Sequence, residues 1–314
     1  MWGLSQSLSR PAQLDTMRFV RWFIFLGVIG GAAGWFLTAP AALDAETSTE
    51  LQQAESDLTH GAQVFWAAGC ASCHIAPKAE KSDAPLLTGG QAFPSDFGTF
   101  YAPNISTDPT HGIGDWSLDD FATALLHGVS PDKKHYYPAF PYGSYAKMTL
   151  PDVAALYAFM QSLPADATPS KPHEIGFPFS IRRSVGAWKQ LYLTDDWAVT
   201  DELTKQETRG RYLSEALAHC GECHTPRDML GGLDQTRWLA GAPNPNGQGK
   251  IPNITPAALD WDDVDLSSYL KTGFTPDYDS AGGHMVAVIE NLSQLSDEDI
   301  DAITAYLRRV PALE

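Results

Sequence analysis

Cys70-Ala-Ser-Cys73-His74 and Cys220-Gly-Glu-Cys223-His224 are two versions of one motif, set 150 residues apart, and they contain every cysteine of the chain. A second pair of matching segments follows in the same order, Pro103-Asn104-Ile105-Ser106 and Pro252-Asn253-Ile254-Thr255. A repeat that keeps its order indicates two homologous units, each the size of an ordinary small domain. We therefore predict an N-terminal segment over 1–45, a first domain over 46–164, a connector over 165–208 and a second domain over 209–314.

The spacing C-x-x-C-H is the attachment sequence for c-type haem. Its two thiols lie one helical turn apart, where each can bond to a vinyl group of the porphyrin, and the histidine that follows can bind the iron. Zinc, an iron–sulfur cluster and a redox disulfide also use C-x-x-C pairs, but none of them requires a histidine directly after both pairs. We therefore predict two covalently bound haem c groups, attached at Cys70, Cys73, Cys220 and Cys223, with His74 and His224 as iron ligands.

Composition narrows the possible partners. The chain has 314 residues, 44% of them hydrophobic and 19% charged, which supports buried cores and excludes a disordered chain. Its formal net charge is −17. Such an acidic protein repels nucleic-acid phosphates, so nucleic-acid binding is not expected. A partner surface is expected to be positive instead, with an encounter that depends on salt.

The N-terminal segment has the features of an export signal or a membrane anchor. No charged residue occurs from Trp22 to Leu43, which is long enough to span a bilayer as a helix. Arg18 and Arg21 precede it, so the positive-inside rule places both domains outside the cytoplasm. We predict a single-pass anchor in the bacterial cytoplasmic membrane with the domains in the periplasm. The alternative is a signal peptide cleaved near Ala39-Pro-Ala41.

The local patterns predict helices rather than long strands. Capping boxes are predicted to open helices at Ser117, Thr149 and Ser296, each with an aspartate three residues later. The connector is too long for a plain loop, and we expect its segment Phe177–Arg183 and Trp188 to pack between the domains. The fold class predicted is therefore all-α.

The two halves resemble class I cytochrome c domains in tandem, and the whole resembles dihaem cytochromes related to the cytochrome subunit of membrane-bound alcohol dehydrogenases. The segments that carry the resemblance are Phe97-Gly-Thr-Phe-Tyr-Ala-Pro-Asn-Ile105, Gly112-Ile-Gly-Asp-Trp116, Tyr137-Pro-Ala-Phe-Pro-Tyr142 and His219-Cys-Gly-Glu-Cys-His-Thr-Pro-Arg227. The family implies His/Met-ligated haems. It also implies that Pro85, in Pro85-Leu-Leu-Thr-Gly89, offers its carbonyl to His74 Nδ1–H. No matching segment is apparent in the second half, so the partner of His224 stays open.

The distal iron ligands are predicted from the same resemblance. Met285 falls where the family places its ligand, between the turn at Gly273 and the last helix. In the first half, relatives often have methionine at the position of Phe140, which cannot bind iron. Met148 lies just before its own terminal helix and is the predicted ligand, with Met160, a histidine or an open iron as alternatives. Met160 itself is expected to fill the core.

The resemblance implies electron transfer rather than catalysis. The expected donor is a membrane-bound or periplasmic dehydrogenase, and the expected acceptor is a terminal oxidase of the respiratory chain or another cytochrome. The alternative is a haem enzyme of the peroxidase kind, which requires an open distal site at the first haem.

Overall fold

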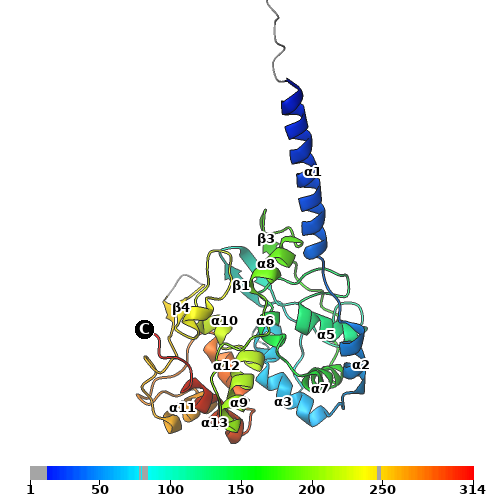
Figure 1. The fold of residues 1–314 in the computed structure, drawn as a ribbon. Coiled ribbons are helices and arrows are strands. Elements are labelled where there is room, and N and C mark those ends of the chain that lie inside the picture. The colour runs from blue at the N-terminus through cyan, green and yellow to red at the C-terminus, as the bar shows by residue number, and fades with distance from the viewer. Residues whose placement is uncertain (1–12, 78, 80–83, 246–248) are drawn as a thin grey trace, which may run out of the picture. The chain divides into compact units, whose positions relative to one another are not determined.

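A computed structural model describes residues 13–77, 79, 84–245 and 249–314 (Figure 1). The chain forms two compact units, residues 1–39 and 40–314. Within the first unit, α1 (Gln13–Leu37) is one unbroken helix. Its stretch Met17–Leu37 is long and apolar enough to cross a membrane, and a signal sequence near an N-terminus has the same properties.

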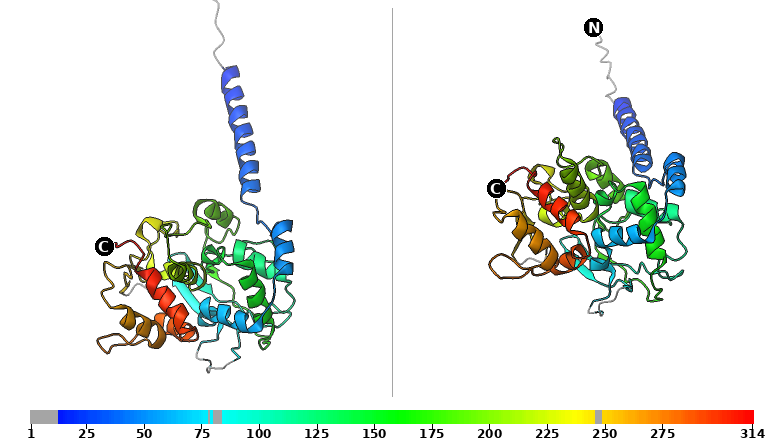
Figure 2. Two further views of the ribbon diagram at one scale, coloured as in Figure 1. Left: turned by 60° about the horizontal axis from the view of Figure 1, so that its bottom comes forward. Right: turned by 90° about the horizontal axis from the view of Figure 1, so that it is seen from below.

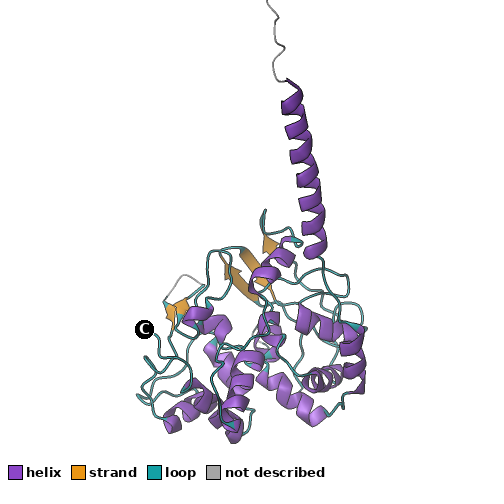
Figure 3. Cartoon of the chain, viewed as in Figure 1, coloured by secondary structure: helices purple, strands orange, loops and turns teal. Residues whose placement is uncertain are grey.

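The second unit is mostly helical, as predicted (Figure 3). Its helices are α2 (Ala45–Gln53), α3 (Leu58–Ala67), α4 (Cys70–His74), α5 (Leu118–His127), α6 (Tyr142–Tyr145), α7 (Leu150–Gln161), α8 (Ser184–Tyr192), α9 (Lys205–Arg211), the π-helix η1 (Tyr212–Leu217), α10 (Gly221–His224), the 3-10 helix η2 (Gln235–Arg237), α11 (Asp263–Thr272), α12 (Met285–Leu292) and α13 (Asp297–Leu307). Strands β1 (Ala92–Ser95), β2 (Gly98–Tyr101) and β3 (Glu174–Ile175) form an antiparallel sheet, and β4 (Ala242–Pro243) pairs with β5 (Lys250–Ile251). One apolar core runs through both halves of this unit.

The sequence repeat appears as two equivalent helix pairs, α3 with α7 and α9 with α13. Each pair meets at a glycine. A Cβ on Gly61 would collide with the carbonyl oxygen of Ala155, and a Cβ on Gly210 would collide with that of Ala302. Because only glycine allows two helix backbones to approach this closely, these positions fix how the two helices of each pair cross.

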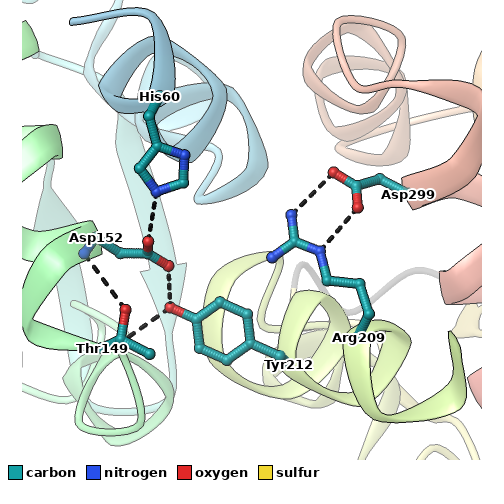
Figure 4. Close-up of polar contacts among 6 residues, drawn as sticks. All are labelled: His60, Thr149, Asp152, Arg209, Tyr212 and Asp299. Atoms are coloured by element: carbon teal, nitrogen blue, oxygen red, sulfur yellow. Dashed lines mark hydrogen bonds and ion pairs between the residues drawn. The ribbon is translucent and has the colours of Figure 1, made fainter. Parts of the chain in front are cut away.

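Each helix pair is also joined by a polar side-chain contact to an aspartate at equivalent positions (Figure 4). His60 Nε2 lies 2.6 Å from Asp152 Oδ1 in the first domain. In the second domain, the Arg209 guanidinium donates two hydrogen bonds, of 2.8 and 2.9 Å, to Asp299. Both aspartates sit three residues after the N-cap of their helix. The aspartate three residues after the N-cap therefore contacts the neighbouring helix in both domains.

This pairing changes two of the three predicted capping boxes. Ser117 and Asp120 form the complete reciprocal box. Thr149 and Ser296 do cap their helices, but the carboxylates expected to complete those boxes bind His60 and Arg209 instead. The Arg209 guanidinium carries a charge and offers two N–H donors, so it gives the Asp299 carboxylate a stronger partner than an N-cap amide does.

The connector contributes structure to the first domain. Strand β3 extends the β1–β2 sheet, and Lys189 of α8 donates hydrogen bonds to the carbonyls of His127 and Gly128 at the end of α5. Trp188 does lie between the domains as predicted, since its indole N–H donates to Leu230 O while its ring contacts Tyr142. The prediction is wrong for Phe177, which is 83% exposed.

Candidate haem-binding sites

The two C-x-x-C-H motifs form two short helices, α4 and α10. Gly69 precedes α4 at φ +66°, a left-handed conformation that favours glycine. All four cysteines are free thiols. Among the described residues, no group of three or more His, Cys, Asp or Glu side chains converges as a metal-binding cluster. The cysteine pairs are thus arranged as two separate motifs and not as one four-cysteine zinc or iron–sulfur site.

The proximal histidines are held by equivalent backbone carbonyls. His74 Nδ1 lies 2.8 Å from Pro103 O, and His224 Nδ1 lies 2.8 Å from Pro252 O. A carbonyl only accepts hydrogen bonds, so each Nδ1 carries the proton and each Nε2 keeps its lone pair. The role predicted for Pro85 is therefore wrong, because the carbonyl that reaches His74 belongs to Pro103.

The repeated Pro-Asn-Ile-Ser/Thr segments explain this arrangement. The Asn104 amide donates to Asp166 O and Thr168 O, and its oxygen accepts from the Ser106 amide. Asn253 makes the matching bonds, to Leu313 O and from the Thr255 amide. Each asparagine fastens its segment to the chain that leaves the last helix of the domain. The sequence repeat predicts that these two segments have the same role in the two domains, and the structure shows that this role is to hold the histidines.

A second correction concerns the segment Pro85–Gly89, which does have a counterpart, residues 237–241. Gly89 N donates to His74 O, and Gly241 N donates to His224 O, both at 2.7 Å. The leucine two residues before each of these glycines is also equivalent. Leu87 O accepts a hydrogen bond from Ile105 N, and Leu239 O accepts one from Ile254 N. Arg237 stands where the first half has Pro85. The carbonyls of Ala102 and Pro103 occupy the space of a Cβ on Gly89, so glycine is required there.

The donor set fits haem c. Burial lowers the pKa of His74 and of His224, which keeps both imidazoles neutral and able to bind a metal through Nε2. Burial also raises the pKa of Cys70 to about 12, of Cys73 to about 11 and of Cys220 to about 12, so these thiols are protonated. Neutral imidazole beside paired, unbridged thiols is the chemistry that haem c attachment requires.

The predicted distal methionines do not occupy equivalent places. Met148 is 5% exposed and lies directly before the N-cap Thr149, whereas Met285 opens α12, well before the N-cap Ser296. Leu295 is the residue that matches Met148 in the repeat. Repeat position therefore gives no support to Met148, and its burial in the core of the first domain is what remains in its favour. Both ligand assignments stay predictions.

Met160 and Phe140 are both part of the first domain. Met160 is 3% exposed in α7, which confirms its place in the core. Phe140 lies among the rings of Tyr136, Tyr142 and Tyr145.

The two motifs lie side by side where the domains meet. Tyr145 of the first domain donates to Ala68 O, just before α4, and its ring contacts that of His219, just before Cys220. The segments that precede the two motifs are thus close in space, although the motifs are 150 residues apart in sequence.

The sequence profile of the Cytochrome c family matches residues 58–164 and 208–311. The chain belongs to this family. A "Diheme cytochrome c-type" protein of Cereibacter sphaeroides is 54% identical over 289 residues, which cover 92% of this chain and 97% of the relative. The predicted resemblance to a dihaem cytochrome is thereby confirmed.

Two further relatives are named as subunits of dehydrogenases. The "Fructose dehydrogenase cytochrome subunit" of Gluconobacter japonicus is 42% identical over 81% of this chain and 53% of its own length. The "Alcohol dehydrogenase (quinone), cytochrome c subunit" of Gluconobacter oxydans is 30% identical over 89% of this chain and 61% of its own. The chain thus spans between half and two thirds of these two relatives.

Proposed function

We propose that this protein is a dihaem electron carrier that works on the periplasmic face of the membrane and is not itself an enzyme. It takes electrons from a membrane-bound or periplasmic dehydrogenase and passes them to a terminal oxidase or another cytochrome. The observation that carries the proposal is the adjacency of two equivalent C-x-x-C-H sites in one compact unit, where Tyr145 contacts the segments that precede both motifs. The dehydrogenase subunits among its relatives favour a dehydrogenase as donor.

Haem c bound at each motif supplies one-electron chemistry through its iron. The chain's own residues hold each site in the state this requires. Cys70 and Cys73 attach the first group, and the Pro103 carbonyl fixes the tautomer and orientation of His74. Cys220, Cys223 and Pro252 do the same around His224. Tyr145 joins the segments beside the two motifs, because its hydroxyl donates to Ala68 O and its ring contacts that of His219.

Haem content tests the proposal directly. A pyridine haemochrome assay and mass spectrometry of the denatured chain are expected to show two covalently added haems. Cys73→Ser is expected to weaken attachment in the first domain and leave the second loaded, with Cys223→Ser as the matched variant. Zinc in place of haem, or haem that is removed by denaturation, would contradict the proposal.

The distal ligands proposed are Met148 for the first iron and Met285 for the second. Met148→His is expected to keep the first haem six-coordinate and lower its potential, because imidazole stabilises ferric iron more than a thioether does. Met285→His should lower only the second potential, and Met160→Leu should change neither. Redox titration with near-infrared magnetic circular dichroism measures this. If Met148→Ala keeps every methionine–iron signature, Met148 is not a ligand.

The N-terminal helix is proposed to remain as a membrane anchor. Fractionation followed by N-terminal sequencing is expected to give a membrane-bound chain that retains Met17–Leu37. A soluble protein that begins near Ala42 would identify this helix as a cleaved signal.

A further inference from the structure

Each domain contains an equivalent hairpin, and the surroundings of the two hairpins differ sharply. Residues 128–136 read Gly-Val-Ser-Pro-Asp-Lys-Lys-His-Tyr, and residues 273–281 read Gly-Phe-Thr-Pro-Asp-Tyr-Asp-Ser-Ala. Each begins with a left-handed glycine that ends a helix, α5 or α11. Each also has a left-handed residue at its tip, Lys133 at φ 57° and Tyr278 at φ 63°. The backbones are therefore equivalent.

In the first domain, the connector covers the hairpin. Lys189 Nζ lies 2.9 Å from Gly128 O, and Arg182 donates a 2.9 Å hydrogen bond to His135 O. Val129, the second residue of the hairpin, is 3% exposed. Two basic side chains from one segment thus satisfy the carbonyls at the end of α5 and along the hairpin.

In the second domain, the same surface is open. Phe274, the counterpart of Val129, is 63% exposed, and Tyr278 is 96% exposed. Beside them, a groove of about 430 Å³ runs along α12, from Val286 to Ser293. Its lining among the described residues comes from residues 271–293 and includes neither Met285 nor the attachment motif. The hairpin between α11 and α12, coloured orange in Figure 2, lies at the edge of the unit.

The charge of the hairpin is reversed as well. Lys133 and Lys134 of the first hairpin are replaced by Tyr278 and Asp279 of the second, while the preceding aspartate is kept. Asp277 and Asp279 are both exposed, and Glu290 lines the groove. An apolar surface with an acidic rim, on a chain of net charge −17, is complementary to a basic protein surface.

We propose that the hairpin 273–281 and the neighbouring groove form the docking surface for a basic protein redox partner. The partner takes the place that the connector takes on the first domain. Its lysine or arginine side chains meet Asp277, Asp279 and the carbonyls at the end of α11, and its apolar side chains cover Phe274 and Tyr278. Calling this partner a redox protein rests on the proposed function, whereas the surface itself follows from comparing the two hairpins.

Reduced protein mixed in a stopped-flow instrument with ferric mitochondrial cytochrome c, a small basic electron acceptor, tests the proposal. At low ionic strength, Asp277→Asn combined with Asp279→Asn is expected to slow the second-order reaction about 3–10-fold and to flatten its salt dependence. Tyr278→Asn removes an apolar contact at a position where asparagine tolerates the backbone. It should slow the reaction several-fold with the salt dependence retained.

The matched controls are Asp132→Asn and Lys133→Asn on the first hairpin, which should react at the wild-type rate or faster. The proposal is overturned if these controls slow the reaction as much as the second-hairpin variants do. It is also overturned if the wild type reacts with small-molecule oxidants but not with the basic protein. Absence of any redox wave in the wild type would instead refute the proposed function.

Discussion

Replacing Asn104 with alanine tests how the first proximal histidine is held. The side chain is 3% exposed, donates hydrogen bonds of 2.7 and 2.8 Å to Asp166 O and Thr168 O, and accepts one of 2.8 Å from the Ser106 amide. At about 1 kcal/mol for each bond, the loss is about 3 kcal/mol. Asp166 O keeps a second donor, the Ser106 hydroxyl, so about 2–3 kcal/mol is expected. For domains of 150–250 residues, that corresponds to a Tm lower by roughly 4–12 °C.

Asn104→Ala should also change the reduction potential of the first haem, through the contact between Pro103 and His74. Once its segment is loosened, the Pro103 carbonyl binds His74 Nδ1–H less well, which makes the imidazole a weaker electron donor. The first haem's potential is therefore expected to rise, and the second haem's to stay unchanged. Asn253→Ala is the matched variant and should shift only the second haem. Thermal unfolding followed in the Soret band and a redox titration measure both effects. An Asn104→Ala protein with wild-type Tm and both potentials unchanged would refute this account of the site.

Three further predictions concern the body of the protein. Gly210→Ala is expected to destabilise it by about 1–3 kcal/mol in chemical denaturation, since overpacking against Ala302 outweighs the gain in helix propensity. Gly143→Ala, whose Cβ would have its nearest neighbour at 4.0 Å, should cost less than the Gly210 change, and equal losses would contradict the close approach. Burial raises the pKa of Glu215 above its ordinary value of 4.5, so the folded state holds the carboxyl proton more tightly than the unfolded state does. The contribution of this group to stability therefore falls as the pH rises above 4.5. Glu215→Gln should flatten Tm against pH above that value, and a parallel shift at every pH would argue against this assignment. Tyr212→Phe removes the hydroxyl that donates to Asp152 and should lower Tm without shifting either potential, and a shifted potential would show that this hydroxyl also acts on a haem site.

The sequence alone determined the cofactor motifs, the repeat and the helical class. C-x-x-C-H is a local motif, because its thiols and histidine lie within one and a half turns of a single helix. Helix starts at Ser117, Thr149 and Ser296 were equally local, since an N-cap needs only its own side chain and an amide three residues on.

Only the tertiary structure decided which distant groups meet. The carbonyl that holds His74 comes from Pro103 and not from Pro85, because the backbone path between them depends on Gly89 and on Asn104 binding the end of the domain. Likewise, Asp152 and Asp299 do not complete the predicted capping boxes, because their carboxylates bind His60 and Arg209 on another helix. Local sequence fixes which groups are available, but choosing among competing partners depends on the chain approaching itself across many residues. For this reason, only the tertiary structure shows that the connector covers the hairpin 128–136 while the hairpin 273–281 is exposed.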